Sequence, residues 1–333
     1  MIPEIFKDKD TIFHYCKTKI AIENILPSEK LRLSPRSYSI DPIENTKPFL
    51  SYSSYGYDND IDFSNSDVRK TANNLIDMIK HTKQLCFCMN DIDTDYGRMT
   101  SIPLEYYGFL KPRMWDQYGD NYKGVCLALS LSGLKKKSDF VHDKIKYISY
   151  NELQFNHFSI NINDLIESGF DSYNRKLFNK LKLVLFRKHQ DYRGECEYRF
   201  CSFSKNDYDF IDIKNSIVGI IISEKYISDE DLNKIHEFAT SYEVEVIGVD
   251  WNESGVSVYP NRRGIDNGNN NQSKINNLKE RINFYKQLIN GLENLKQYGY
   301  LQDSDIDEYK IKLKILEKQI KKFIITSIYS TYT

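Results

Sequence analysis

The 333-residue sequence lacks several features that would place it in a common functional class. Its longest apolar runs, such as Ile217–Ile222, are far shorter than the ~20 residues that a membrane-spanning helix needs. The first residues do not form a basic segment followed by an apolar one, so no secretory leader is predicted. Lys plus Arg (46) nearly balances Asp plus Glu (47), which removes any general attraction to nucleic acid. We therefore expect a cytoplasmic protein that binds neither membranes nor nucleic acid.

The motifs of several common catalytic classes are also missing. GxGxxG, the P-loop and GxSxG do not occur, which argues against a Rossmann domain, a P-loop hydrolase and a serine hydrolase. The six cysteines never adopt CxxC spacing, and most lie in apolar segments, as buried reduced thiols do. The alternating Asp91, Asp93 and Asp95 are more typical of a capped loop than of a metal site. No metal is expected.

What is present favours a folded α+β protein, because 40% hydrophobic residues suffice for a core of ordinary size. Most predicted strands are too apolar to face water, which favours a mixed and largely buried sheet with flanking helices. Strands are predicted at 11–16, 30–34, 84–89, 124–131, 144–149, 198–203, 217–222 and 243–249. Helices are predicted at 19–26, 67–83, 162–187 and 229–240. The polar segment 41–66 is predicted to be a long loop and is a candidate lid.

The composition changes near Pro260 and predicts three parts: an α+β core over 1–259, a polar linker over 260–272 and a helical region over 273–333. Apolar residues recur at heptad spacing in two runs on either side of Gly299, which predicts an antiparallel helical hairpin. A hairpin this small is either a stabilising appendage or a device for association. In the second case, residues 273–323 would bind another copy of the chain or a protein partner.

Three short segments, far apart in the chain, carry residues that a packed core does not require. They are His14-Tyr15, the string MWDQYGDNYKGVC from Met114 to Cys126, and ECEYR from Glu195 to Arg199. Together they predict one cleft assembled from distant segments. The alternatives are that His14 is a core histidine and that the two glutamates are exposed strand residues paired with neighbouring arginines.

These segments resemble a bacterial family known as domain of unknown function 2971. The resemblance rests on His14-Tyr15, the strand KLRLS with the following SPRSYSIDPIE (34–44), MWDQYGDNYKGVC and ExExR, and it extends from about residue 11 to about residue 225. The chain departs from the family pattern at Ile40, where Asn is more usual, and at Tyr198, where Trp is usual. The family name implies no activity.

The order of a His-Tyr strand, a short helix and a late ExE also resembles the layout of ADP-ribosyltransferases, which split NAD. This resemblance implies an ADP-ribosyltransferase-like fold with NAD as substrate. It implies that Glu197 stabilises the oxocarbenium-like ribose, that Glu195 orients the acceptor, and that His14 binds a ribose. The further binding candidates are Tyr15, Trp115 and Tyr118 as stacking rings, Arg32 and Arg36 for a pyrophosphate, and Arg199.

Two functional hypotheses remain open from the sequence. The first is an ADP-ribosyltransferase or NAD glycohydrolase. The second is a non-catalytic module that senses a nucleotide or binds a protein partner, for instance in bacterial defence or toxin systems.

Overall fold

The computed structural model describes residues 2–39, 41–45, 50–55, 66–91, 103–154, 158–223, 226–253 and 255–261, together with shorter stretches between 279 and 318. The chain divides into two compact units. The larger comprises Met1–Asp231 and Phe238–Tyr259, and the smaller comprises Leu232–Glu237 and Pro260–Thr333. Each unit is described by itself.

The larger unit is built around a ten-stranded mixed sheet, which confirms the α+β class. The strands are β1 (Thr11–Cys16), β2 (Lys30–Pro35), β3 (Leu50–Ser53), β4 (Lys83–Met89), β5 (Val125–Ser130), β6 (Val141–Lys144), β7 (Lys146–Ile148), β8 (Phe158–Asn161), β9 (Arg187–His189), β10 (Glu197–Ser202), β11 (Asp209–Asp212), β12 (Ile217–Ile222), β13 (Val246–Asn252) and β14 (Gly255–Pro260). The main path of the sheet is β11-β2-β4-β1-β5-β12-β13-β14, and β10 pairs with both β4 and β6. Two short pairs, β3 with β8 and β7 with β9, lie outside this sheet.

The helices are mostly short. The α-helices are α1 (Glu4–Lys7), α2 (Thr18–Ile20), α3 (Leu26–Ser28), α4 (Pro42–Asn45), α5 (Ser66–Lys80), α6 (Pro112–Gln117), α7 (Leu131–Lys136), α8 (Tyr150–Gln154), α9 (Ile162–Ser168), α10 (Phe170–Leu185) and α11 (Asp229–Ser241). A π-helical turn, η1 (Ala21–Ile25), joins α2 to α3, and 3₁₀ turns of the described residues are η2 (Arg36–Tyr38), η3 (Leu104–Tyr106) and η4 (Gln190–Glu195). None of the helices among the described residues is both long and apolar enough to cross a membrane.

The central strand β5 explains why the sheet is buried. Its residues Val125–Leu129 are buried on both faces, and it pairs antiparallel with β1 on one side and β12 on the other. In sequence, a strand that is covered on both faces is a continuous run of apolar residues, and the segment VCLAL is such a run. One aromatic core packs against this part of the sheet and includes Phe6, Phe13, Tyr15, Phe109 and Trp115.

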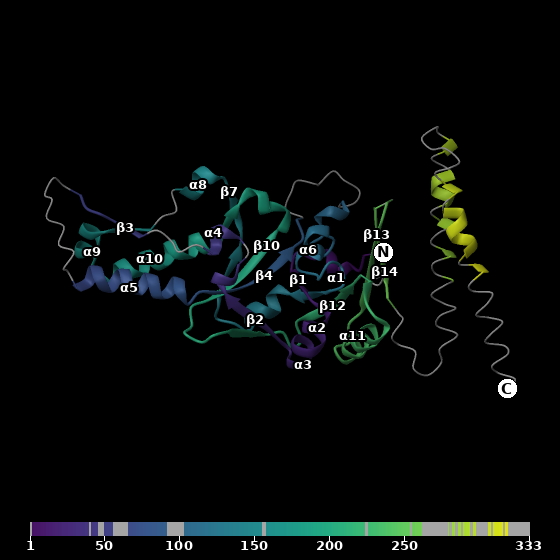
Figure 1. Ribbon diagram of the computed structural model, residues 1–333, viewed down its shortest axis with the longest axis horizontal. Coiled ribbons are helices and arrows are strands. Elements are labelled where there is room, and N and C mark those ends of the chain that lie inside the picture. The colour runs from purple at the N-terminus through teal and green to yellow at the C-terminus, as the bar shows by residue number, and fades with distance from the viewer. Residues whose placement is uncertain are drawn as a thin grey trace. The chain divides into compact units, whose positions relative to one another are not determined.

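Two strands, β1 and β2, pair with opposite ends of the same edge of β4, and the sheet is split between them. β1 pairs with β4 only at Ile12 opposite Met89 and Phe13 opposite Cys88. β2 pairs with β4 only at the other end, at Ser34 opposite Gln84 and at the following residue. Among the described residues, no strand pairs with 85–87 on this edge. The segment α2-η1-α3 connects β1 to β2 across the gap (Figure 1).

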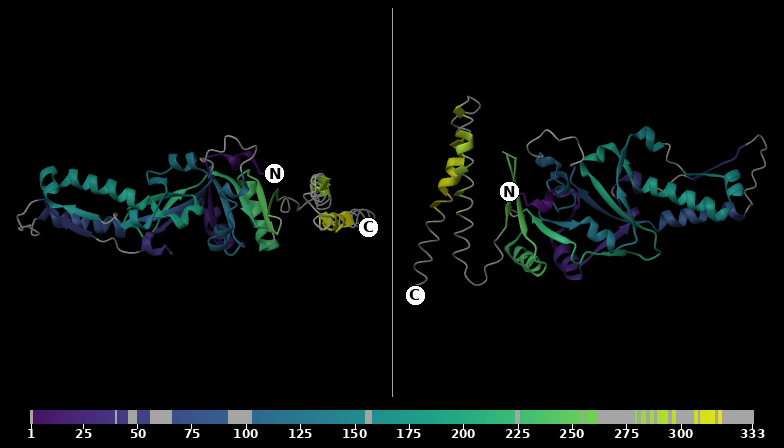
Figure 2. Two further views of the ribbon diagram at one scale, coloured as in Figure 1. Left: turned by 90° about the horizontal axis from the view of Figure 1, so that it is seen from above. Right: turned by 180° about the vertical axis from the view of Figure 1, so that it is seen from behind.

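Helices α5, α9 and α10 contact one another beyond the sheet, and both views of Figure 2 show α5 and α10 side by side. Their apolar residues, including Val68, Ala72, Leu165 and Leu177, form a second core. α5 and α10 present these residues at helical spacing, which is why both were predictable as helices. The predicted helix 162–187 is two helices, because Gly169 adopts a φ of 74° and ends α9.

The segment 41–66 is not wholly a loop. It contains α4 and β3, and β3 pairs in parallel with β8 through registers such as Leu50 opposite Phe158. Residues 46–49 and 56–65 lie outside the described residues. α4 carries Glu44, which is buried. The candidate lid therefore contributes a fixed charged residue to the interior.

In the smaller unit, the described residues between 279 and 318 are helical. Two ion pairs join the sequence before Gly299 to the sequence after it: Lys286 with Glu317 (3.7 Å) and Lys310 with Glu293 (2.8 Å). Ile282, Ile289 and Ile306 are buried. Most of the predicted linker and much of the predicted hairpin lie outside the described residues.

Candidate functional site

A cavity of about 630 Å³ lies at the split in the sheet. β1, β2, β4, β10 and the α2-η1-α3 segment all contribute lining residues. This volume is within the range typical of small-molecule sites in proteins. Of the residues predicted from sequence to form a cleft, the lining includes His14, Tyr15, Arg32, Tyr118, Glu195, Glu197 and Arg199. It does not include Trp115 or Arg36.

His14 lies where β1 leaves β4. Its Nδ1 is 3.2 Å from the carbonyl oxygen of Cys86, and a carbonyl only accepts, so Nδ1 carries the proton when the ring is neutral. Burial lowers the pKa of His14, although the bond to Cys86 acts in the opposite direction. The imidazole is therefore neutral at pH 7, and its Nε2 is a hydrogen-bond acceptor.

The aromatic candidates differ in position. Trp115 is fully buried and donates its Nε1 hydrogen to the carbonyl of Phe109 (2.8 Å), so it is a core residue and the prediction that it stacks on a ligand is not supported. Tyr15 is also buried and donates its hydroxyl to the carbonyl of Gly108 (2.7 Å), although it borders the cavity. Tyr118 is the exposed ring of the three, at 40%.

The turn after α6 positions Tyr118. Asp120, Asn121 and Tyr122 all have positive φ (51°, 52° and 68°), an uncommon run for residues with side chains. Gly124 accommodates this turn because a Cβ there would lie 2.4 Å from the carbonyl oxygen of Cys16. Burial and the charge of Glu195 raise the pKa of Tyr118 to about 12, so its phenol stays protonated.

The sequence predicted that the two glutamates of the ExE motif lie on one strand. They do not, but their carboxylates converge on Lys188. Glu195 ends η4, Cys196 adopts a left-handed conformation (φ 48°), and Glu197 begins β10. Both carboxylates contact Lys188 Nζ: Glu195 Oε2 at 2.7 Å and Glu197 Oε2 at 3.4 Å. The alternative of exposed strand residues paired with neighbouring arginines is wrong about exposure, because both glutamates are buried, but Glu197 does pair with Arg199.

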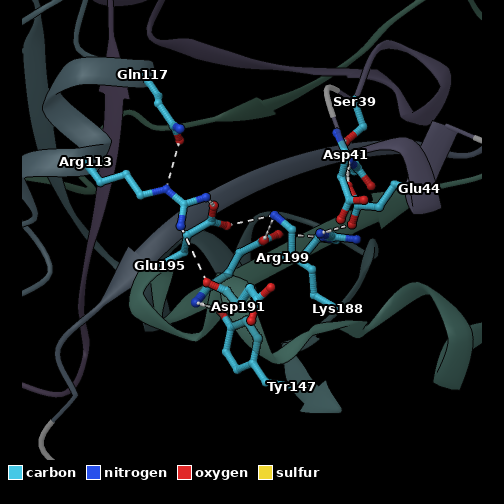
Figure 3. A network of polar contacts seen from close by, with 12 residues as sticks. Ser39, Asp41, Glu44, Arg113, Gln117, Tyr147, Lys188, Asp191, Glu195 and Arg199 are labelled. Carbon is cyan, nitrogen blue, oxygen red and sulfur yellow. Dashed lines mark hydrogen bonds and ion pairs between the residues drawn. The ribbon is translucent and has the colours of Figure 1, made fainter. Parts of the chain in front are cut away.

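Arg199 connects this pair to the segment before β3. Its Nε donates to Glu197 Oε1 (2.6 Å), its Nη2 to Glu44 Oε1 (2.5 Å) and its Nη1 to the carbonyl of Leu185 (2.8 Å). We call Glu44, Lys188, Glu195, Glu197 and Arg199 the buried charge cluster. It combines three carboxylates with two cations, and Figure 3 shows Glu44, Arg199, Lys188 and Glu195 gathered in it.

The two cations control the ionisation of the cluster. Burial alone would raise the pKa of each carboxylate, but the charges of Arg199 and Lys188 lower the pKa of Glu197, and they lower that of Glu44 to about 2. For Glu195 burial prevails and the pKa is raised. The three carboxylates in turn raise the pKa of Lys188 against the effect of burial. Glu44 and Glu197 are therefore ionised at neutral pH.

One oxygen in the cluster lacks a hydrogen-bond donor. Glu195 Oε1 is buried, and no described residue donates to it. Arg113 Nη2, from α6, lies 3.7 Å away, beyond hydrogen-bond distance, and the Arg113 side chain is about half exposed. A bound molecule with an N–H or O–H group would satisfy this oxygen.

The opposite side of the cavity is formed by the neighbouring strands β2 and β11. We call Lys30, Arg32, Tyr208 and Phe210 the β2–β11 face. Arg32 lies with its guanidinium carbon 4.4 Å from the centre of the Tyr208 ring. Among the described residues, no carboxylate is within ion-pair distance of Arg32 or Lys30.

The described residues contain no group of three or more His, Cys, Asp and Glu side chains placed to hold a metal ion. Asp91 is described, but Asp93 and Asp95 lie outside the described residues, so their arrangement as a loop stays a prediction.

Several contributors to the cavity were not identified from the sequence, among them Glu44, Lys188, Tyr208 and Phe210. Glu44 is part of the string that carries the family resemblance, but it had no assigned role. Lys188, Tyr208 and Phe210 belong to no motif. In KLRLS and in DFID, exposed and buried residues alternate, which shows the outward faces of β2 and β11. This alternation was the signal in the sequence that could have indicated the side chains on these two strands.

The fold and the cavity define an α+β protein with a split sheet and buried ionised groups beside the split. Residues 114–200 match the model of a family described as "Protein of unknown function (DUF2971)". This segment contains Tyr118, Lys188, Glu195, Glu197 and Arg199, and the match supports the family resemblance seen in the sequence. Comparison with curated proteins and with solved structures gave no match.

Proposed function

We propose that this protein binds NAD or a related nucleotide in the cavity and splits the bond between nicotinamide and ribose. The observation that carries the proposal is the distribution of charge around the cavity. On one side lies the buried charge cluster, with three carboxylates and two cations, and on the other lie Lys30 and Arg32, which form no ion pair with a carboxylate in the described part of the chain. NAD carries an anionic diphosphate and, at its nicotinamide end, a cationic pyridinium ring, so these two groups match the two sides.

The chemistry requires a carboxylate near the reacting ribose. When the glycosidic bond breaks, its electron pair leaves with nicotinamide, which becomes neutral, and positive charge develops on the ribose. An ionised carboxylate beside the 2′-hydroxyl stabilises this transition state more than the ground state. Glu197 is assigned this role because Arg199 and Lys188 keep it ionised.

Glu195 is assigned the role of the base that activates the acceptor. The lone pair of an acceptor alcohol, amine or water forms the new bond to the ribose carbon, and its proton passes to a base. Glu195 Oε1 accepts no hydrogen bond from any described residue, and the raised pKa of Glu195 brings it closer to that of an effective base at neutral pH. If the acceptor is water, the same steps constitute NAD hydrolysis.

His14 and Tyr118 position the substrate in this proposal. The neutral His14 accepts a hydrogen bond from a ribose hydroxyl through Nε2. Tyr118, exposed within the cavity lining, offers its ring to nicotinamide. The order of a His-Tyr strand, an intervening glycine-bracketed turn and a late pair of glutamates supports an ADP-ribosyltransferase-like fold as part of the same proposal.

One observation favours a second candidate, a nucleotide sensor without catalysis. Glu197 has both carboxylate oxygens engaged by Arg199 and Lys188, and its side chain is almost fully buried. A cluster satisfied in this way resembles a structural network as much as a reactive one. In this version the cavity recognises the nucleotide and the smaller unit transmits its presence to a partner, for example in bacterial defence.

The experiment is an assay of nicotinamide release from NAD by the purified protein. Glu197→Gln keeps the shape and an oxygen acceptor for Arg199 but removes the charge, and it is expected to lower the rate by about 100-fold or more. Glu152→Gln, at an exposed glutamate of α8, is the matched control and keeps full activity. Wild-type turnover in Glu197→Gln contradicts its assigned role. Nucleotide binding without any turnover supports the sensor instead.

The proposal includes a helical hairpin in the smaller unit that mediates association. The ion pairs Lys286–Glu317 and Lys310–Glu293 support antiparallel pairing, because they join residues in opposite order along the two segments. Ile311 and Ile315 are more than half exposed, one turn apart. Light scattering is expected to report an oligomer for the wild type and a smaller species for Ile311→Lys with Ile315→Lys. An unchanged mass contradicts this role.

A further inference from the structure

The β2–β11 face carries side chains that neither the core nor the proposed reaction uses. β2 and β11 pair antiparallel, with Phe210 opposite Arg32. The alternate residues Leu31 and Leu33 are buried, so the side chains of Lys30 and Arg32 point the other way, away from the core. Phe210 is 53% exposed on this outward face. A single exposed phenylalanine is ordinary on a protein surface, but one that lines a cavity offers its ring to a bound ligand.

Arg32 is the second unusual feature. Its guanidinium lies over the ring of Tyr208, which fixes the cation in position without neutralising it. Arg199, on the other side of the cavity, is bound by two carboxylates and is unavailable to a ligand. The free hydrogen-bond donors of Arg32 therefore make it the cavity's anion-binding group, with Lys30 beside it along β2.

Both features face the same space. Arg32, Tyr208 and Phe210 line the cavity, and so does Tyr38, which is 67% exposed just after β2. A ligand that satisfies this face needs a flat ring for Phe210 and a compact anion for Arg32, joined by a short linker. Nucleoside diphosphates have this combination, because the base stacks on aromatic rings and the diphosphate takes paired guanidinium hydrogen bonds.

We infer that the β2–β11 face binds the nucleoside diphosphate portion of the ligand, with the base on Phe210 and the diphosphate on Arg32. This inference rests on the proposed function only in using the same cavity. It places the diphosphate away from the carboxylates of the buried charge cluster, which would repel it. The remainder of a dinucleotide then extends across the split toward Glu197. The face determines which ligand binds, and the cluster determines what happens to it.

The test is isothermal titration of the full-length protein with ADP, adenosine and nicotinamide mononucleotide. ADP is expected to bind at least tenfold more tightly than either, because only ADP offers both the base and the diphosphate. Phe210→Ala and Arg32→Gln are each expected to weaken ADP binding by about ten- to a hundredfold, as loss of a base stack or of a charged hydrogen bond does. Tyr55→Ala and Arg175→Gln change an exposed tyrosine and an exposed arginine outside the cavity, and both keep wild-type affinity.

The outcomes separate this inference from the proposed reaction. ADP binding that is lost in both face variants, in a protein that never releases nicotinamide, supports the inference and contradicts the reaction. Nicotinamide release with an unchanged KM in Phe210→Ala and Arg32→Gln overturns the inference and keeps the reaction. Equal affinity for ADP and adenosine also overturns it. Tighter binding of a single-stranded oligonucleotide than of ADP would assign the face to nucleic acid instead.

Discussion

The two sides of the cavity differ in how their charged side chains are placed: one side buries and pairs them, and the other leaves them exposed. In the buried charge cluster, Arg199 and Lys188 pair with three carboxylates, and all five groups are buried. On the β2–β11 face, Arg32 and Phe210 are exposed, and no carboxylate of the described residues pairs with Arg32. Breaking a buried pair leaves a charge without compensation, whereas removing an exposed side chain leaves nothing unsatisfied. The cluster should therefore matter to stability as well as function, and the face to ligand binding alone.

The largest expected effect is that of Arg199→Met. The substitution leaves Glu44 and Glu197 without their shared cation in a buried site, and it should destabilise the fold by about 3–5 kcal/mol. Arg32→Met is the matched control, because it removes the same group from the exposed face and should change stability by less than about 0.5 kcal/mol. Urea unfolding of the two variants measures the difference. Equal losses would show that the two sides do not differ as argued.

Lys188→Met should lower the free energy of unfolding somewhat less, by about 3 kcal/mol at pH 7. The size of this loss should depend on pH. Without Lys188, Glu195 and Glu197 lose a shared cation, so the pKa of each carboxyl is higher than in the wild type. As the pH falls, a proton takes the place of the missing cation. In thermal unfolding, the difference in Tm between the variant and the wild type should therefore become smaller toward pH 5. Lys188→Arg keeps the charge and should show no such narrowing; a gap independent of pH contradicts the prediction.

The sequence predicted the strands better than it predicted the cluster. β1, β4, β5 and β12 are mostly apolar segments, and burial on both faces of the sheet leaves a pattern that can be recognised in the local sequence. His14, Glu195 and Glu197 were predictable as site candidates because they belong to recognisable motifs.

Other parts could not be predicted, because they depend on long-range geometry. Glu44 joins the cluster through a contact with Arg199, 155 residues away in sequence. Trp115 looked like a binding residue within its motif, and only the three-dimensional packing against Tyr15 and Trp251 shows it to be core. The split between β1 and β2 exists because both strands pair with β4 at different ends, and no local pattern specifies that register.

Acid titration should show the contribution of Glu44. Its pKa is about 2 in the folded chain against 4.5 for an unperturbed glutamate, so its ionised form stabilises the fold above pH 4.5. This contribution, about 3 kcal/mol, is lost as the pH falls toward 2. Glu44→Gln should be less stable than wild type at pH 7, and the two should converge near pH 2. A constant difference across this range would show that Glu44 acts through packing rather than charge.

The smallest expected effect is on the β2–β11 face, where Phe210→Ser should change the unfolding free energy by less than about 0.5 kcal/mol. Phe210 is more than half exposed, so the substitution opens no cavity. The same substitution at Phe200, which is fully buried on β10, should cost several kcal/mol and serves as the contrast. A large loss in Phe210→Ser would mean that this ring supports the fold. A negligible loss would show that the fold does not need this ring, as a role in ligand recognition alone requires.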